Sequence, residues 1–283
     1  MKYVNAFLFS NLFIVCCALL MCWYTAQVLD FEVPLSFDFY GFVASATMSS
    51  YALHWYLSAS EVDESVRGKW TMRHKKILLF LFVFSTIICT YFCFIFRVHW
   101  VVLVPLALLT FLYSAPKIPV WPFYMLAKKA YAKTFYLSAI WTIVTVILPI
   151  QLTDNQWNIL FYCFFVNRFL LIYTICLCFD FRDRNIDERS SILNITQFFT
   201  RRQIAYLIVF CGVLFGYASY AIWLHHVTNI HIFCIVLPFI FLLFTLRKSL
   251  YSQSDYWYYF VLDGLMMGSS LVYIVYVFLG FMF

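Results

Sequence analysis

The fold class of this chain is decided by residues 157–179, WNILFYCFFVNRFLLIYTICLCF, which contain one charged side chain, that of Arg168. A helix that crosses the apolar core of a bilayer needs about 20 predominantly apolar residues. Similar windows recur along the chain, and they predict an all-α membrane protein with a single transmembrane domain, residues 1–283. The nine predicted transmembrane helices cover residues 5–26, 37–57, 77–96, 98–114, 134–151, 157–179, 203–224, 229–247 and 255–282.

The composition excludes a soluble globular domain. Of the 283 residues, 65% are hydrophobic and 11% are charged, whereas soluble domains have roughly 45–50% apolar and about 25% charged residues. The net charge of +6 does not indicate a nucleic-acid partner, because most basic residues flank the apolar segments. The ten cysteines lie within apolar segments and are interpreted as small buried residues.

The basic residues predict the orientation in the membrane. Lys and Arg accumulate in cytoplasmic loops, and 17 of the 19 basic residues lie on one side of the nine-helix arrangement. We therefore expect the N-terminus inside and the C-terminus outside, and a location in the bacterial inner (cytoplasmic) membrane. The long loops after the second, fourth and sixth segments lie on the inner side, where we expect any chemistry.

Three carboxylates follow the sixth segment in DFRDRNIDER, residues 180–189. Asp180, Asp183 and Asp187 have the spacing i, i+3, i+7, which places them on one face of a continuing helix. Such a face can hold Mg²⁺, which couples carboxylates to phosphates. The alternative is a solvated helix end whose acids are neutralised by neighbouring arginines, namely Arg182, Arg184 and Arg189.

This acidic pattern resembles the second Asp-rich motif of the UbiA superfamily of intramembrane prenyltransferases. The segment Leu112–Lys117, LYSAPK, resembles that family's Tyr-Ser-x-Pro segment, and Asp263 resembles a recurring acid in its last helix. The resemblance implies a nine-helix bundle around a lipid-open cavity. It also implies transfer of a polyprenyl group from its diphosphate to a membrane-embedded acceptor, with Mg²⁺ as cofactor.

The family's first Asp-rich motif is absent from the matching position, where residues 49–56 read SSYALHWY. Glu61, Asp63 and Glu64 follow, but their spacing differs from the motif. We therefore expect at most one Mg²⁺, held by Asp180 and Asp183 with Asp187 peripheral. Without metal, we expect Arg182, Arg184 or a loop lysine to fold over the acids.

Candidate catalytic residues at the inner side are His54 and Lys117. His54 can hydrogen-bond a phosphate or act as a base, and Lys117 can contact a phosphate as a point charge. Tyr113 and Arg184 are further candidates for substrate binding, and so are the loop residues Lys128, Lys129 and Lys133. In the alternative interpretation His54 packs structurally beside Trp55, and the lysines only set the orientation.

Arg168 is predicted to lie about 18 Å deeper than Asp180, at 1.5 Å per residue. A charge at that depth requires a partner, and we expect Asp263 to provide it. The alternative is that Arg168 and Asn167 line a pocket for the acceptor.

Two functions remain open on the sequence alone. The first is a Mg²⁺-dependent prenyltransferase of the UbiA type, supported by the intact second motif. The second is a non-catalytic UbiA-like protein that binds a membrane lipid or isoprenoid, or a partner membrane protein, supported by the missing first motif.

Overall fold

The computed structural model describes residues 2–59, 65–117, 133–153, 157–189 and 195–280; the side chains of 116, 185–189 and 195 lie outside this description. The described residues are helical almost throughout and form no strand, which confirms the all-α class. The N-terminal half consists of α1 (Lys2–Phe9), α2 (Leu12–Val28), α3 (Phe37–Ser58), α4 (Val66–Arg73), α5 (Lys75–Ile95), η1 (Arg97–His99), α6 (Trp100–Ser114) and η2 (Ala115–Lys117).

The C-terminal half continues this helical arrangement, and helices occupy each of the nine segments that the hydropathy pattern marks. Two of its elements, η4 and η6, are π-helices. The elements are α8 (Lys133–Thr142), η4 (Ile143–Ile147), α9 (Leu148–Leu152), α10 (Ile159–Arg189), η5 (Ile195–Phe198), α11 (Arg201–Leu224), α12 (Asn229–Phe244), α13 (Leu246–Tyr251), η6 (Trp257–Leu262), α14 (Asp263–Met266) and α15 (Gly268–Gly280).

Several helices are long and apolar enough to cross a membrane. Among the described residues there are five, or seven if each of two bent helix pairs counts as one span. Their outward side chains are strongly apolar: Phe80, Ile87 and Tyr206 are 64%, 66% and 72% exposed. Exposed apolar surface on this scale marks a lipid-facing protein. The chain is therefore an integral membrane protein.

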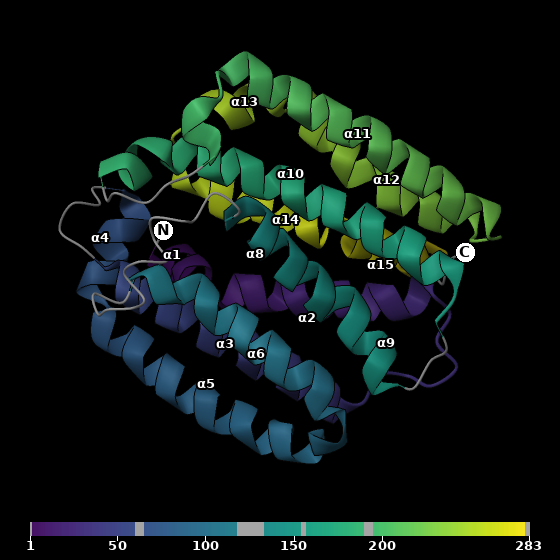
Figure 1. Cartoon of the computed structure of the whole chain (residues 1–283), viewed down its shortest axis with the longest axis horizontal. Helices are drawn as coiled ribbons and strands as arrows, with labels where there is room; N and C mark the ends of the chain where they lie inside the picture. Colours follow the sequence, from purple (N-terminus) through teal and green to yellow (C-terminus); the bar gives the residue numbers. More distant parts are fainter. Residues whose placement is uncertain (1, 60–64, 118–132, 154–156, 190–194, 281–283) are drawn as a thin grey trace.

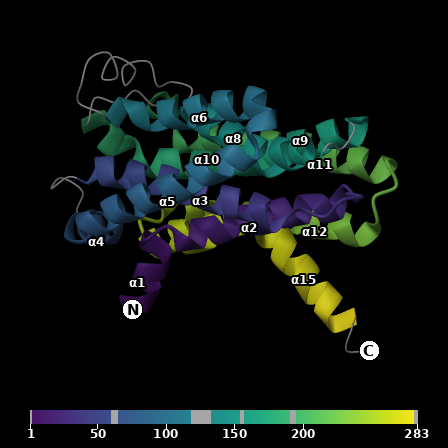
Figure 2. The same cartoon turned by 90° about the horizontal axis from the view of Figure 1, so that it is seen from below.

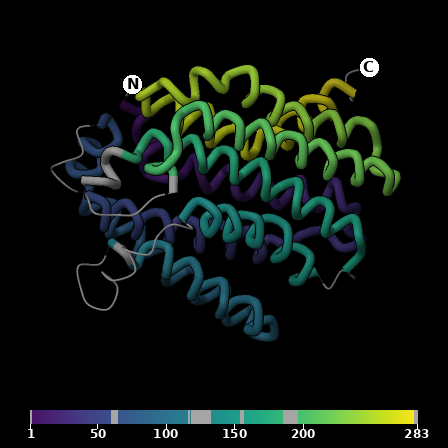
Figure 3. The backbone as a smooth tube through the Cα atoms, turned by 45° about the horizontal axis from the view of Figure 1, so that its top comes forward, coloured from purple at the N-terminus to yellow at the C-terminus, as the bar shows by residue number. Residues whose placement is uncertain are grey.

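The longest helix, α10, lies at the centre of the bundle. It packs against α8 on one side and α11 on the other, while α2 packs against α3 and α3 against α5. Figure 1 shows α11 and α12 above α10, and α3, α5 and α6 below it. Most helices follow the long axis of the molecule (Figure 3), so residues near helix ends gather at its two ends.

Two breaks bend the first and the last helical segments of the bundle. Helices α1 and α2 meet at 55°, and α14 and α15 meet at 64°. Asn11 at the first break has a left-handed backbone with φ of 73°, which Asn tolerates better than most residues. Figure 2 shows α1 and α15 leaving the body of the bundle on the same side. The first break places the Asn11 side chain beside α4.

The π-helix η6 positions two buried tyrosines. A π-helix has a wider turn than an α-helix, and such turns are frequent at functional sites. The Tyr258 hydroxyl donates to the carbonyl of Ser249 at 2.5 Å. Tyr259, the next residue, is also buried and contacts charged side chains from α4 and α10. The widened turn therefore brings a tyrosine into the charged end of the bundle.

Candidate functional site

Charged and aromatic side chains gather at the end of the bundle where α4 and the start of α8 lie, on the left of Figure 1. They come from the last turns of α3 and α10, from α4, η2 and η6, and from the first residues of α8. Three small clusters make up this basic end. Each is held by contacts between segments that are far apart in the sequence.

The first cluster joins His54 to Lys117. The Lys117 ammonium lies 2.9 Å from His54 Nε2 and also donates to the Ser58 hydroxyl. An ammonium has no acceptor, so His54 Nε2 accepts this bond and the imidazole is neutral. Its Nδ1 then carries the proton, toward the Ser114 hydroxyl at 3.4 Å. The Tyr113 ring stacks on the imidazole at 5.0 Å.

The structure thus brings together three residues predicted from two separate segments, namely His54, Tyr113 and Lys117. His54 and Lys117 are far apart in the sequence but close in space, because the end of α6 packs against α3. A lysine and an imidazole held by hydroxyl groups form a pair that can bind an anion or relay a proton.

The second cluster surrounds Asp180. Lys133 Nζ lies 3.3 Å from Asp180 Oδ1, and the Thr134 hydroxyl donates to Asp180 Oδ2. The Thr196 hydroxyl donates to the backbone carbonyl of Asp180 at 3.0 Å. The carboxylate is buried. Each of its oxygens contacts a residue at the start of α8, Lys133 or Thr134.

The third cluster is an ion network around Arg182. Its Nε and Nη2 donate to the two oxygens of Asp183 at 2.6 and 3.2 Å, and Nη2 also donates to Tyr259 at 2.9 Å. Its Nη1 lies 3.6 Å from Asp255. Asp255 also accepts the backbone N–H of Arg67 at 2.9 Å. One carboxylate therefore ties α4 to α10.

Arg67 inserts from α4 between aromatic rings. Its guanidinium carbon lies 3.7 Å from the ring centre of Trp55 and 4.2 Å from that of Tyr259, within the range of cation–π attraction. Its Nη2 donates to Asn11 at 2.8 Å. Burial lowers the pKa of this guanidinium, an effect that the neighbouring Tyr259 and acids oppose. The group stays charged, because arginine is not deprotonated in proteins.

The acids carry cations of the chain itself: Arg182 covers Asp183 and Lys133 covers Asp180. The side chain of Asp187 lies outside the described residues, as do Lys128 and Lys129. Elsewhere in the described chain, no three His, Cys, Asp or Glu side chains lie close enough to hold a metal ion. In this arrangement Asp180 and Asp183 do not form a ready Mg²⁺ site, because their oxygens are engaged.

The predicted pair of Arg168 and Asp263 is wrong. Arg168 is buried as expected, but its Nη1 donates to the carbonyl of Met21 at 3.4 Å, and its guanidinium lies over the Phe164 ring. Among the described residues, no ion pair joins it to an acid. The backbone carbonyl of Asp263 lies 3.6 Å from the Cys17 thiol of α2. Arg168 and Asp263 therefore have different neighbours.

Two other predicted binding residues lie apart from the first cluster. Asn167 donates to the Ser219 hydroxyl at 2.8 Å and to the carbonyl of Phe215 at 3.4 Å, so it joins α10 to α11. Arg184 lies over the Phe181 ring at 4.4 Å. Neither contacts His54 or Lys117 in the described structure. Asn167 thus joins two helices, and its role in lining an acceptor pocket beside Arg168 stays a prediction.

Sequence reasoning missed the roles of Asp255, Tyr259 and Thr134. Asp255 stands at the start of the last predicted segment, where an acid beside an apolar run was a usable signal. Tyr259 is one of 21 tyrosines, and nothing in its sequence context singles it out. The ten cysteines are all free; six are buried, and four are partly exposed, namely Cys16, Cys89, Cys93 and Cys163.

No family model, no curated protein and no solved structure matches this chain. The fold and the site define it as a helical integral membrane protein with a basic, aromatic cluster at one end of its bundle.

Proposed function

We propose that this chain binds an isoprenoid or related lipid through a phosphate headgroup at the basic end of its bundle. The observation that carries the proposal is the convergence of Lys117, His54 and Tyr113 from two segments. Lysine binds phosphate as a point charge, and imidazole N–H groups can add a hydrogen bond. The rings of Tyr113 and Trp55 offer apolar surface to the first carbons of a lipid chain.

The topology that suits this function has nine transmembrane helices, with the N-terminus inside and the C-terminus outside. The agreement between helical segments and apolar windows supports it, and so does the concentration of basic residues at one end. In this orientation the site opens at the cytoplasmic side, where isoprenoid phosphates meet the membrane surface. A UbiA-like bundle is the arrangement that we infer for these helices.

Cysteine labelling checks this topology. Single cysteines at Lys69 and Arg184, introduced into a variant without reactive native cysteines, should react with a membrane-impermeant maleimide only after the membrane is opened. Cysteines at Asp38 and Thr228 should react in intact cells. The reverse pattern would overturn the orientation, and reaction of both sets from one side would contradict the predicted crossings between these positions.

A second candidate function is Mg²⁺-dependent prenyl transfer. The observation that favours it is the retention of Asp180 and Asp183 one turn apart on α10, close to the cations of the basic end. Departure of a diphosphate leaves negative charge that metal ions and fixed cations stabilise. Here Lys133 and Arg182 would first have to release the two acids. We therefore place lipid binding ahead of catalysis.

One binding experiment tests both candidates. Purified protein in detergent is titrated with a non-hydrolysable geranylgeranyl diphosphate analogue, with and without Mg²⁺. If the basic end binds the headgroup, Lys117→Gln should weaken binding roughly tenfold, the value of one charge-assisted hydrogen bond. Arg97→Gln, which removes an exposed charge beyond the far end of α5, should leave the affinity unchanged.

The dependence on metal separates the candidates. Saturable binding that needs no Mg²⁺ supports a lipid-binding protein. Binding that needs Mg²⁺ and is abolished by Asp183→Asn supports an enzyme. Absence of saturable binding in both conditions, or equal losses in Lys117→Gln and Arg97→Gln, contradicts a headgroup site at the basic end.

A further inference from the structure

We propose that the α4–α5 corner, formed by Arg73, His74, Lys75 and Lys76, binds the headgroup of an anionic phospholipid. These four side chains are consecutive in the sequence where α4 ends and α5 begins. They border a hollow of about 400 Å³ whose opposite wall includes Tyr56 of α3. No residue of this corner belongs to the basic end described above, so the proposal is independent of the proposed function.

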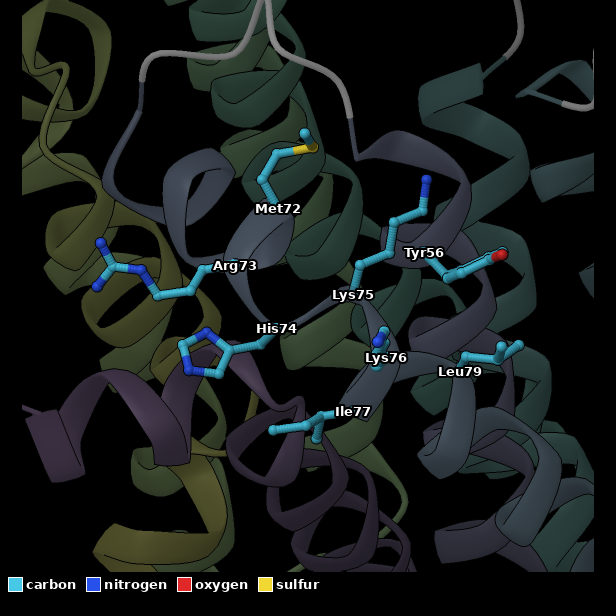
Figure 4. A pocket seen from close by; sticks show the side chains of 8 residues that line it. All are labelled: Tyr56, Met72, Arg73, His74, Lys75, Lys76, Ile77 and Leu79. Atoms are coloured by element: carbon cyan, nitrogen blue, oxygen red, sulfur yellow. The ribbon is translucent and has the colours of Figure 1, made fainter.

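The side chains of the corner are arranged around the chain reversal between the two helices. Figure 4 shows Arg73 and His74 extending to one side of it and Lys75 rising beside Tyr56 on the other. Lys75 Nζ lies 5.0 Å from the centre of the Tyr56 ring. The His74 ring stacks on Trp70 at 4.4 Å, and its Nδ1 lies 2.9 Å from the carbonyl of Trp70. The imidazole is therefore fixed in place.

The corner carries positive charge, and its cations form no ion pair within the described ranges. The first turns of α4 and α5 also contain no acidic residue. Clustered cations of this kind attract anionic headgroups at a membrane surface, and each basic residue contributes about 1 kcal/mol there. The concentration of exposed cations around this hollow favours an anionic ligand.

The surface beside the corner identifies this anion as a lipid. An exposed apolar face begins at Ile77 and follows α5 away from the corner, with Phe80, Phe84 and Ile87 at 64%, 52% and 66% exposure. Their spacing by three and four residues keeps them on one side of the helix. A phospholipid can place its phosphate at the corner and lay its acyl chains along this face. A free phosphate would use only the first part of this surface.

Lipid competition tests the proposal on the full chain. Protein in mixed micelles that contain equal amounts of phosphatidylglycerol and phosphatidylcholine is analysed by native mass spectrometry for bound lipid. We expect the wild type to prefer phosphatidylglycerol. The triple variant Arg73→Gln, Lys75→Gln, Lys76→Gln should lose at least about tenfold of this preference at low salt, since three surface charges are removed.

The matched control removes the same charge from other exposed sites: Lys2→Gln, Arg202→Gln, Arg247→Gln. This variant should keep the preference within about twofold. The single variant Lys76→Gln, with an intermediate loss, replaces the triple variant if the latter does not fold. Inorganic phosphate at millimolar concentration should not displace the lipid. Equal losses in the two triple variants, or displacement by phosphate, would overturn an anionic lipid site at this corner.

Discussion

Replacing Arg182 by Met is expected to lower the free energy of unfolding by about 3–5 kcal/mol, the usual effect of leaving buried charges unpaired. Arg182 holds Asp183 through two hydrogen bonds and lies 3.6 Å from Asp255. Its removal leaves two carboxylates near each other at the end of the bundle, and Asp255 is buried. The measurement is unfolding in mixed micelles with increasing fractions of sodium dodecyl sulfate, followed by tryptophan fluorescence.

The neighbouring Arg184 provides a control for this substitution. It lies on the same helix two residues further on, is half-buried, and contacts the Phe181 ring. Arg184→Met should therefore change the free energy of unfolding by less than about 1 kcal/mol, the size of a single cation–π contact near the surface. Combining Arg182→Met with Asp255→Asn should recover part of the loss. The amide removes the buried charge, and its oxygen can still accept the Arg67 N–H.

If Arg182→Met and Arg184→Met have the same small effect, the ion network does not stabilise the bundle. A large loss for Arg182→Met without any recovery in the double variant would mean that packing against Tyr258 and Tyr259, rather than charge, is the main contribution of Arg182. Both rings lie within 5.0 Å of its guanidinium carbon.

Replacing Arg168 by Met is expected to have the opposite sign. Arg168 is a buried cation that donates a 3.4 Å hydrogen bond to Met21 and has no acid beside it in the described structure. Apolar residues of similar volume often stabilise a protein by about 1–4 kcal/mol when they replace buried ionic groups. We expect a gain of about 1–3 kcal/mol in the same unfolding assay, reduced by the lost hydrogen bond and ring contact.

The double variant with Asp263→Leu tests the absence of a pair directly. Because the two side chains form no ion pair, their effects should add within about 0.5 kcal/mol. A loss of stability in Arg168→Met that Asp263→Leu relieves would show that the two charges are coupled after all. Asp263→Leu alone serves as the reference for that comparison.

The ion pairs at the basic end also bear on the choice between binding and catalysis. A metal ion that takes Asp180 and Asp183 as ligands must displace Lys133 and Arg182, and a phosphate could then receive these cations. The protein would then replace its internal ion pairs by contacts of the acids with the metal and of the cations with the phosphate. The affinity for Mg²⁺ alone is therefore expected to be low, whereas a ligand that brings both phosphate and metal could support the exchange.

The apolar windows of the sequence located the long helices but not α4 (Val66–Arg73), which lies between two windows. Every predicted segment is helical, because a run of about 20 apolar residues in lipid must satisfy its backbone groups internally. The junction between the predicted segments 77–96 and 98–114 is a short 3₁₀ turn at Arg97–His99. The sequence also predicted that Asp180 and Asp183 require neutralising cations, because carboxylates close together on one helix face repel each other.

The partners of the charges were decided only by the tertiary structure. Depth in the membrane follows from counting residues, but the direction of a side chain around its helix and the neighbour it meets do not. Arg168 comes twelve residues before Asp180 on α10, so the two side chains point about 120° apart around the helix. Arg168 contacts Met21 of α2 and not Asp263. In the same way, Asp255 and Arg67 are 188 residues apart in sequence and meet only because the folded chain brings α4 beside the start of the last helical segment. Sequence determines which charges must be compensated, whereas the rotation and packing of helices determine which groups compensate them, because ion pairs form only at short range.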